Sequence, residues 1–309
     1  MKANKWFLLF LAVCLVFSFI ACDDGDDSDE PDLPGPPAET PWLCFTAGED
    51  ASKVSTAIVL ADGTVTSSLP ALEYSLDGGI SWDTFTVADT QVTLAKTGDK
   101  MYLRAKATND VFSDVVDNDN YRIIGFTMEG SIAASGNVMS LVDKDCETTA
   151  IPSPFCFYDL FCYCDVLTSA PELPATTLTF GCYGNMFYNC TSLTEAPELP
   201  ATTMVDCCYS CMFKGCTSLE KAPELKAATL VAECYDRMFD YCSSLNSITV
   251  HFTSWGSGTP TNMWVNDVAA TGDFYCPSSL VHTPLEDEDF SYNKVPLDKD
   301  HRWTVHSLD

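Results

Sequence analysis

Apolar residues recur with a period of 26 through the middle of this chain. A single unit of this length cannot bury its own apolar face, so the repetition predicts units that stack on one another. Cysteine, phenylalanine and leucine dominate the recurring positions, which are Cys164, Leu167, Cys182, Phe187, Cys190, Leu193, Cys208, Phe213, Cys216, Leu219, Cys234, Phe239, Cys242 and Leu245.

The pattern inside one unit predicts two short elements. Cys234, Met238, Cys242 and Leu245 recur at helical spacing, which indicates an apolar stripe on a short helix. The following segment is extended and carries a proline that cannot donate to a strand ladder. We therefore expect very short strands at 168–170, 194–196 and 220–222. The predicted fold is an α/β solenoid of about four 26-residue units.

Residues 42–125 follow a different pattern. Met101 to Ala107 alternates between apolar and polar side chains, as in a half-buried strand. Leu72 to Phe85 is typical of a hairpin that turns at Asp77-Gly78-Gly79, because glycine accepts positive φ. Strand-sized segments at close spacing predict a small all-β, sandwich-like domain ahead of the repeats.

The first 41 residues predict export and anchoring. Lys2 and Lys5 precede an apolar run of about 22 Å in helical length, short of a ~30 Å bilayer core, so residues 1–21 are interpreted as a signal peptide. Ala21-Cys22 resembles the lipobox of bacterial lipoproteins, which implies a lipid on Cys22. The acidic, proline-rich residues 22–41 then form a tether, and the acidic run resembles a surface-export signal. The expected location is the bacterial outer membrane, lipid-anchored and facing outward.

The formal net charge of −28 excludes some partners. Nucleic acids and anionic lipid surfaces are polyanions, so neither is expected to bind, and the membrane is reached only through the anchor. Cations or a basic surface of another protein are favoured.

The cysteines are interpreted as packing residues. On a helix, eight residues separate the two columns of one unit by about 12 Å, too far for a disulfide. Cys208 and Cys211 have metal-ligand spacing, but a zinc site needs two further ligands that the sequence does not supply nearby. No metal or other cofactor is expected. Pairing among the remaining cysteines stays open.

Polar residues in register with the repeat are the candidate ligand-facing positions. They are Thr168, Ser169, Glu172, Thr194, Glu195, Glu198, Glu220, Lys221 and Glu224. Adjacent strands lie ~4.8 Å apart, so the glutamates would stack. The functional interpretations are a Ca²⁺ site or a surface for a basic partner, and a plain solvated face is the favoured interpretation for any single residue.

Ser75 to Trp82 matches the Asp-box hairpin of sialidases. The motif is structural even in those enzymes, it occurs once, and the chain has only four arginines, so a stable hairpin is the favoured interpretation. No nucleophile elbow, zinc-protease motif or phosphate loop is present in the sequence. We expect no enzymatic activity.

Met-Phe-x-x-Cys-Thr-Ser-Leu followed by Ala-Pro-Glu-Leu, as at Met186 to Leu199, resembles the BspA-like leucine-rich-repeat surface proteins. The resemblance implies a repeat domain over 126–250 with an entry cap at 132–141, and a C-terminal cap over 251–309. It also implies an adhesin-like protein that binds an extracellular protein or glycan, whose identity it does not give. The alternative is a glycan-processing enzyme, or an accessory glycan-binding lipoprotein of a surface uptake system.

Overall fold

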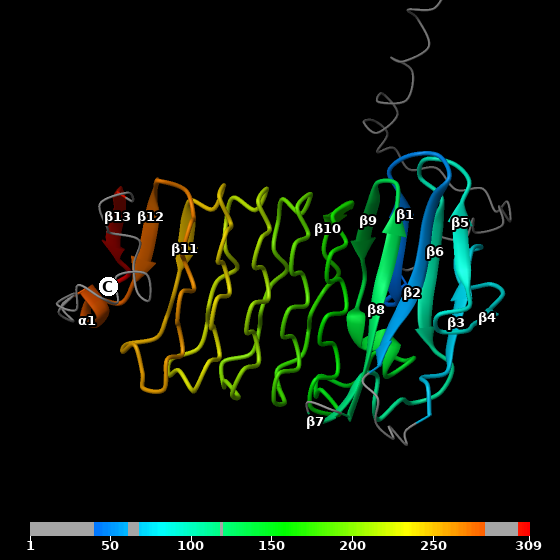
Figure 1. Cartoon of the computed structure of the whole chain (residues 1–309), viewed down its shortest axis with the longest axis horizontal. Helices are drawn as coiled ribbons and strands as arrows, with labels where there is room; N and C mark the ends of the chain where they lie inside the picture. The colour runs from blue at the N-terminus through cyan, green and yellow to red at the C-terminus, as the bar shows by residue number, and fades with distance from the viewer. Residues whose placement is uncertain (1–39, 61–67, 118–119, 282–301) are drawn as a thin grey trace, which may run out of the picture. The chain divides into compact units, whose positions relative to one another are not determined.

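In the part of the chain that the structure describes, the protein is mostly β, with three open sheets and almost no helix. The computed structural model describes residues 40–60, 68–117, 120–281 and 302–309, which all belong to one compact unit (Figure 1). Its strands are β1 (Leu43–Ala47), β2 (Ser52–Leu60), β3 (Leu72–Ser75), β4 (Asp83–Phe85), β5 (Gln91–Leu94), β6 (Lys100–Ala105), β7 (Asp114–Asp117), β8 (Asn120–Glu129), β9 (Ile132–Ser135), β10 (Leu167–Ser169), β11 (Ser247–Thr249), β12 (Thr271–Cys276) and β13 (Arg302–Ser307). The described helices are one 3-10 turn, η1 (Val138–Leu141), and one α-helical turn, α1 (Ser278–Val281).

Two sheets pack face to face in the N-terminal half. One has the order β10-β9-β1-β6-β3-β4 and the other β5-β2-β8-β7. Phe45 of β1 and Phe126 of β8 meet across the interface, with ring centroids 4.9 Å apart. The alternation predicted from Met101 onward is confirmed in β6, where Met101, Leu103 and Ala105 are buried. The predicted hairpin is also present as β3 and β4.

The first sheet continues into the repeats. β9 pairs antiparallel with β1, and β10 pairs parallel with β9, so strands from both predicted domains belong to one sheet. The expected boundary between residues 125 and 126 falls inside β8. Phe126 also stacks on Phe161 of the first repeat at 5.1 Å. The hydrophobic core is therefore continuous across this boundary.

The helix predicted in each repeat unit is wrong. Residues 155–164 instead form a ribbon of successive turns, and we call this segment and its repeats at 181–190, 207–216 and 233–242 the turn ribbon. Alternate amides close local turns, as Leu160 N does on Phe157 O at 3.3 Å. The amides between them reach the next unit, as Phe157 N does to Cys182 O at 3.0 Å. The backbone therefore forms hydrogen bonds between units, as strands of a sheet do. In a helix, the backbone N–H and C=O groups would bond within the same segment.

The turn ribbon has a period of four residues. Over a segment this short, that spacing resembles the 3.6-residue period of a helix. Left-handed backbone occurs at every fourth position, and one unit places Gly181, Asn185 and Asn189 there with φ of 59°, 52° and 57°. Glycine and asparagine are the residues that accept this conformation most readily. The same period leaves adjacent pairs such as Met186 and Phe187 pointing into the core.

Aromatic rings stack from unit to unit inside the core. The rings of Phe161, Phe187, Phe213 and Phe239 lie 5.4–5.8 Å apart and within 7° of parallel. A second stack runs through Tyr183, Tyr209 and Tyr235. Full burial of one such ring contributes about 1.5–3 kcal/mol. The stacked rings are thus a main source of cohesion between units.

All fourteen recurring positions that the sequence singled out are between 0% and 3% exposed. The thiols of Cys190, Cys216 and Cys242 donate to the carbonyl oxygens of Phe161, Phe187 and Phe213, each at 3.0–3.1 Å in the preceding unit. The fourteen cysteines in the described part of the chain are free thiols. The two cysteine columns of a unit are held apart by the turn ribbon. The expectation that the rise of a helix separates them is wrong.

The extended segment of each unit is shorter than a regular strand. The strand expected at 168–170 is β10, while those at 194–196 and 220–222 reduce to the single parallel bridges Glu195 to Lys221 and Lys221 to Ser247. A proline follows each bridge and ends the ladder, because it has no N–H. Strands β11, β12 and β13 form the third, parallel sheet and close the C-terminal end.

Candidate binding groove

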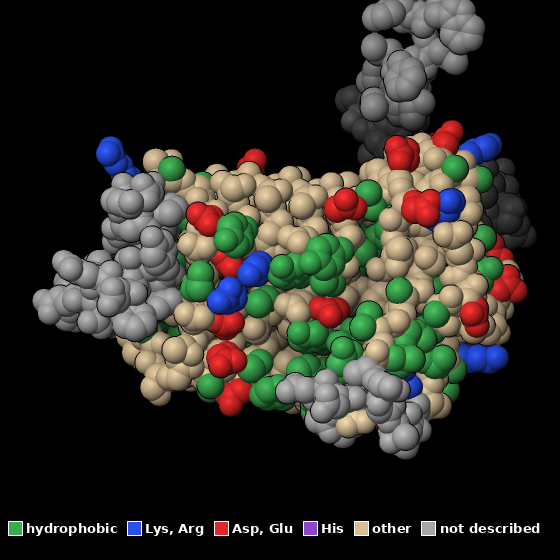
Figure 2. Space-filling model, in the orientation of Figure 1, with side chains coloured by type: hydrophobic (Ala, Val, Ile, Leu, Met, Phe, Trp, Pro, Cys, Tyr) green, Lys and Arg blue, Asp and Glu red, His purple; other side chains and the backbone are tan. Residues whose placement is uncertain are grey.

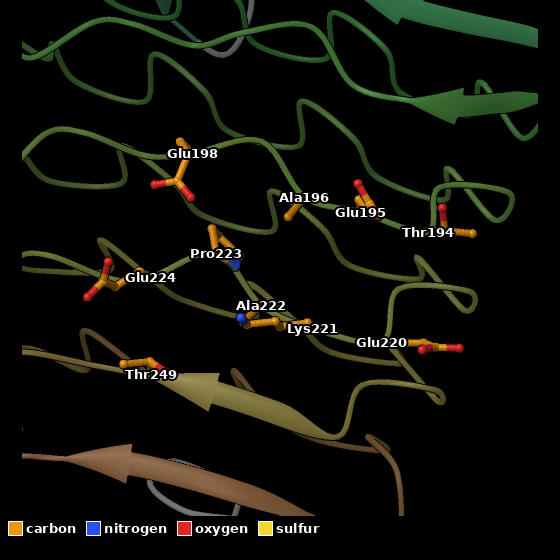
Figure 3. A pocket seen from close by; sticks show the side chains of 10 residues that line it. All are labelled: Thr194, Glu195, Ala196, Glu198, Glu220, Lys221, Ala222, Pro223, Glu224 and Thr249. Atoms are coloured by element: carbon orange, nitrogen blue, oxygen red, sulfur yellow. The ribbon is translucent and has the colours of Figure 1, made fainter. Parts of the chain in front are cut away.

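The candidate ligand-facing residues lie over the short parallel bridges, and the structure brings seven of the nine into two adjoining hollows. The larger hollow, of about 670 Å³, falls within the size range of ligand sites (Figure 3). It is lined by Thr194, Glu195, Ala196, Glu198, Glu220, Lys221, Ala222, Pro223, Glu224 and Thr249. We call it the polar hollow.

The second hollow, of about 440 Å³, is largely apolar. It is lined by Ala170, Pro171, Glu172, Leu173, Pro174, Pro197, Glu198 and Pro200. Because Glu198 lines both, the two hollows adjoin, and together we call them the repeat groove. The groove therefore crosses several units of the stack.

Small and rigid residues create the groove. Alanines 170, 196 and 222 stand in one column and leave room above the backbone, while the next column holds Pro171, Pro197 and Pro223. Beneath them Leu173, Leu199 and Leu225 are buried, so the floor is fixed by the core. A floor made from proline and buried leucine costs little further conformational entropy when a ligand binds.

Thr168 and Ser169 do not line the groove. Their hydroxyls donate to the carbonyl oxygens of Ile132 at 3.1 Å and Ala134 at 2.8 Å. Both side chains therefore tie β10 to β9, and their part is to position the first repeat.

Two of the groove glutamates contact a basic side chain. Lys226 Nζ lies 3.1 Å from Glu198 Oε2, and His251 Nε2 lies 2.6 Å from Glu224 Oε1. Within the described residues, Glu172, Glu195 and Glu220 have no ion-pair partner within 4.0 Å, and neither does Lys221. In Figure 3 the Lys221 side chain lies along the backbone toward Ala222. The groove thus keeps acidic groups free for a ligand.

No Ca²⁺ or zinc site is supported in the part of the chain that the structure describes. There, no three His, Cys, Asp or Glu side chains come close enough to hold a metal ion. Cys208 is buried, and Cys207 donates its thiol to Glu233 at 3.5 Å.

The Asp-box segment is a closed hairpin. The Asp77 carboxylate accepts bonds from the Ser81 hydroxyl at 2.6 Å and the Ser81 amide at 2.9 Å. The bond from the Ser81 hydroxyl, followed by that from its amide, lowers the pKa of Asp77 to about 2. Arg104 stacks on Trp82, 3.7 Å from the ring centroid, and pairs with Glu73 at 2.7 Å. The polar groups of the hairpin bond to one another, so this segment stabilises the fold.

No family model, curated protein or solved structure matches this chain. The groove is therefore the feature of this chain that bears on its function. None of the helices among the described residues has the length and apolar character that a membrane span requires. The predicted signal peptide, Cys22 and tether residues 22–39 lie outside the described residues. At the end of the predicted tether, the Pro41 carbonyl oxygen accepts the Asn137 amide at 2.8 Å.

Sequence reasoning missed the apolar hollow and the rim residues His251 and Thr249. The signal for the hollow is a second proline three residues after the first, as in Pro171 with Pro174 and Pro197 with Pro200. His251 belongs to a unit whose sequence has diverged from the repeat, so periodicity could not place it beside Glu224.

Proposed function

We propose that this chain is a lipid-anchored cell-surface binding protein whose repeat groove takes a protein or glycan ligand. In this proposal the stacked units form a short leucine-rich-repeat solenoid of the BspA-like kind, with residues 251–309 as its C-terminal cap. Cys22 carries the lipid, and the protein faces outward from the outer membrane.

The groove is the observation that supports a binding role. Three units place alanines, prolines and glutamates in register, and the result is a rigid hollow bordered by charged groups. Binding sites combine such a concave apolar surface with a few polar groups that set orientation. On the face drawn in Figure 2, acidic and hydrophobic side chains are interspersed over the repeat units.

A binding screen with groove variants tests the proposal. The purified full-length chain is screened in detergent against arrayed glycans and extracellular proteins. Ala196→Arg places a long side chain in the polar hollow and is expected to reduce binding of the true ligand at least about tenfold, about 1.4 kcal/mol. Ala95→Arg is the matched control, because Ala95 is exposed and lies outside the groove.

Equal binding by the Ala196→Arg and Ala95→Arg proteins, with both correctly folded, would contradict a ligand site in the groove. Anchoring is tested separately. Cys22→Ala is expected to move the protein from the membrane fraction to the soluble fraction, and unchanged fractionation and lipid labelling would exclude lipidation at this residue.

A further inference from the structure

From the chemistry of the groove lining, we infer that the ligand is an extended, basic segment of a protein. This inference rests on the proposed binding function and narrows it, because it selects polypeptide over glycan. Three properties of the lining lead to it: its hydrogen-bonding capacity, its charge and its apolar floor.

Among its side chains, the lining carries more hydrogen-bond acceptors than donors, since five glutamates face one lysine and two threonines. Pro171, Pro197 and Pro223 remove backbone donors from three successive units. Ionised glutamates are acceptors only, and five of them border the groove: Glu172, Glu195, Glu198, Glu220 and Glu224. A ligand that satisfies this surface must bring donors. Lysine and arginine side chains and the amides of an extended chain provide them.

The charge of the groove selects the same class. Lys226 contacts Glu198 and His251 contacts Glu224, but Glu172, Glu195 and Glu220 have no such contact among the described residues. They add to the field of a chain with net charge −28. Such a surface attracts cations and repels anionic ligands, more strongly at low salt.

The apolar hollow excludes a simple polyamine as the best occupant. Pro171, Pro174, Pro197 and Pro200 line it together with Leu173. Aliphatic stems of lysine and arginine, or prolines of the ligand, can cover this surface while cationic groups reach the glutamates at its border. A small polyamine would leave much of the apolar hollow exposed to water. A basic peptide that also carries apolar residues satisfies both parts of the groove.

Lys221 allows the sign of the ligand's charge to be tested. It is exposed, lies in the polar hollow and opposes a cationic ligand. Glu195→Gln is therefore expected to weaken binding of a basic peptide by about 3- to 10-fold, while Lys221→Gln strengthens it by a similar factor. An acidic ligand would show the reverse order.

The probes are fluorescent peptides of about ten residues, which span about 30 Å when extended. Lysine alternates with proline in the first, serine with proline in the second and glutamate with proline in the third, and spermine serves as a competitor. Binding to the full-length chain is followed by fluorescence anisotropy at two salt concentrations. We expect the lysine peptide to bind at least about tenfold more tightly than the serine peptide, and the glutamate peptide not to bind. Spermine should compete only weakly.

Two controls locate the effect. Glu147→Gln makes the same charge change at an exposed site outside the groove and should leave binding unchanged. Tyr241→Ala alters a competing surface, the edge of the turn ribbon where Tyr163 and Tyr241 are 67% and 52% exposed, and should also have no effect. Loss of binding in Tyr241→Ala, with Glu195→Gln unaffected, would overturn the inference in favour of that edge.

Failure of the inference can be distinguished from failure of the proposed function. If the peptides do not bind but a glycan from the array binds and is lost in Ala196→Arg, the groove is a ligand site and the basic-peptide assignment is wrong. If spermine competes as strongly as the lysine peptide binds, charge alone is recognised and the assignment again fails. If no ligand is lost in Ala196→Arg, both the assignment and the groove are wrong.

Discussion

The thiol of Cys216 donates a hydrogen bond to the carbonyl oxygen of Phe187, 3.0 Å away in the preceding repeat unit. The same carbonyl accepts the amide of Cys190 at 3.1 Å, so one oxygen closes a turn and also joins two units. Cys242 with Phe213 and Cys190 with Phe161 repeat the relationship. The conspicuous cysteine column is thus a column of buried donors.

Substitution of Cys216 measures this role. Cys216→Ser keeps a donor but buries a more polar group, and we expect it to cost about 1–3 kcal/mol of unfolding free energy. Cys216→Val lacks the donor and is bulkier, so it should cost more than the serine variant. Urea denaturation of both proteins gives the comparison. A valine variant as stable as the native chain would show that the column only fills space.

Thiol labelling tests the burial of both cysteine columns. Cys182, Cys190, Cys208, Cys216, Cys234 and Cys242 are buried, whereas Cys146, Cys162, Cys207 and Cys211 are partly exposed. Alkylation of the native protein should modify the second group first and the first group only after denaturation. Mass spectrometry of the digested protein assigns each site. Disulfides within or between the columns, or rapid native labelling of them, would contradict the stacked arrangement.

Stability should fall at alkaline pH. Burial raises the pKa of Cys156 to about 12 and that of Cys182 to about 11, from an ordinary value of 9.0. A raised pKa in the folded state means that stability is complete below pH 9.0 and is lost as the pH rises toward the folded value. Each such thiol should remove about 1.4 kcal/mol per pH unit in this window. Denaturant midpoints measured across it should decrease, and Cys182→Ala should flatten the slope. A midpoint that does not change above pH 9.0 would be inconsistent with neutral, buried thiols.

The sequence predicts the repeat and the buried columns, but not the local backbone. Cys234, Met238 and Cys242 recur every four residues, and over two turns this spacing cannot be told from the 3.6-residue period of a helix. The distinguishing signal lies at Gly181, Asn185 and Asn189, which occupy left-handed positions four residues apart. Gly184 carries a further signal, since a Cβ there would lie 2.8 Å from the Tyr158 ring of the preceding unit.

The groove could be predicted only in part. Periodicity places Glu195, Glu198 and Lys221 on one surface, and the structure gathers them in the polar hollow. Periodicity cannot show that the Thr168 and Ser169 hydroxyls donate to carbonyl oxygens of β9, because those bonds depend on how the first sheet meets the first unit. Contacts between a repeat and a non-repeating segment leave no periodic trace in the sequence.

The continuous core leads to a prediction about fragments. A chain cut after residue 125 loses Phe126, which packs on Phe45, and loses β9, which pairs with β1. We expect the 42–125 fragment not to unfold cooperatively in a thermal melt followed by circular dichroism. The 42–141 fragment restores β8, β9 and η1 and should show more β-structure. Cooperative unfolding of 42–125 by itself would establish an independent domain.

The most direct test of the binding account is hydrogen–deuterium exchange on the full chain, with and without the tightest-binding partner from the screen. The account predicts slower exchange on binding in residues 194–196 and 220–222, which lie along the polar hollow, and unchanged exchange in the turn ribbon at 158–163 and 237–241. Protection confined to the turn ribbon or to the two N-terminal sheets, with 194–196 and 220–222 unchanged, would contradict it.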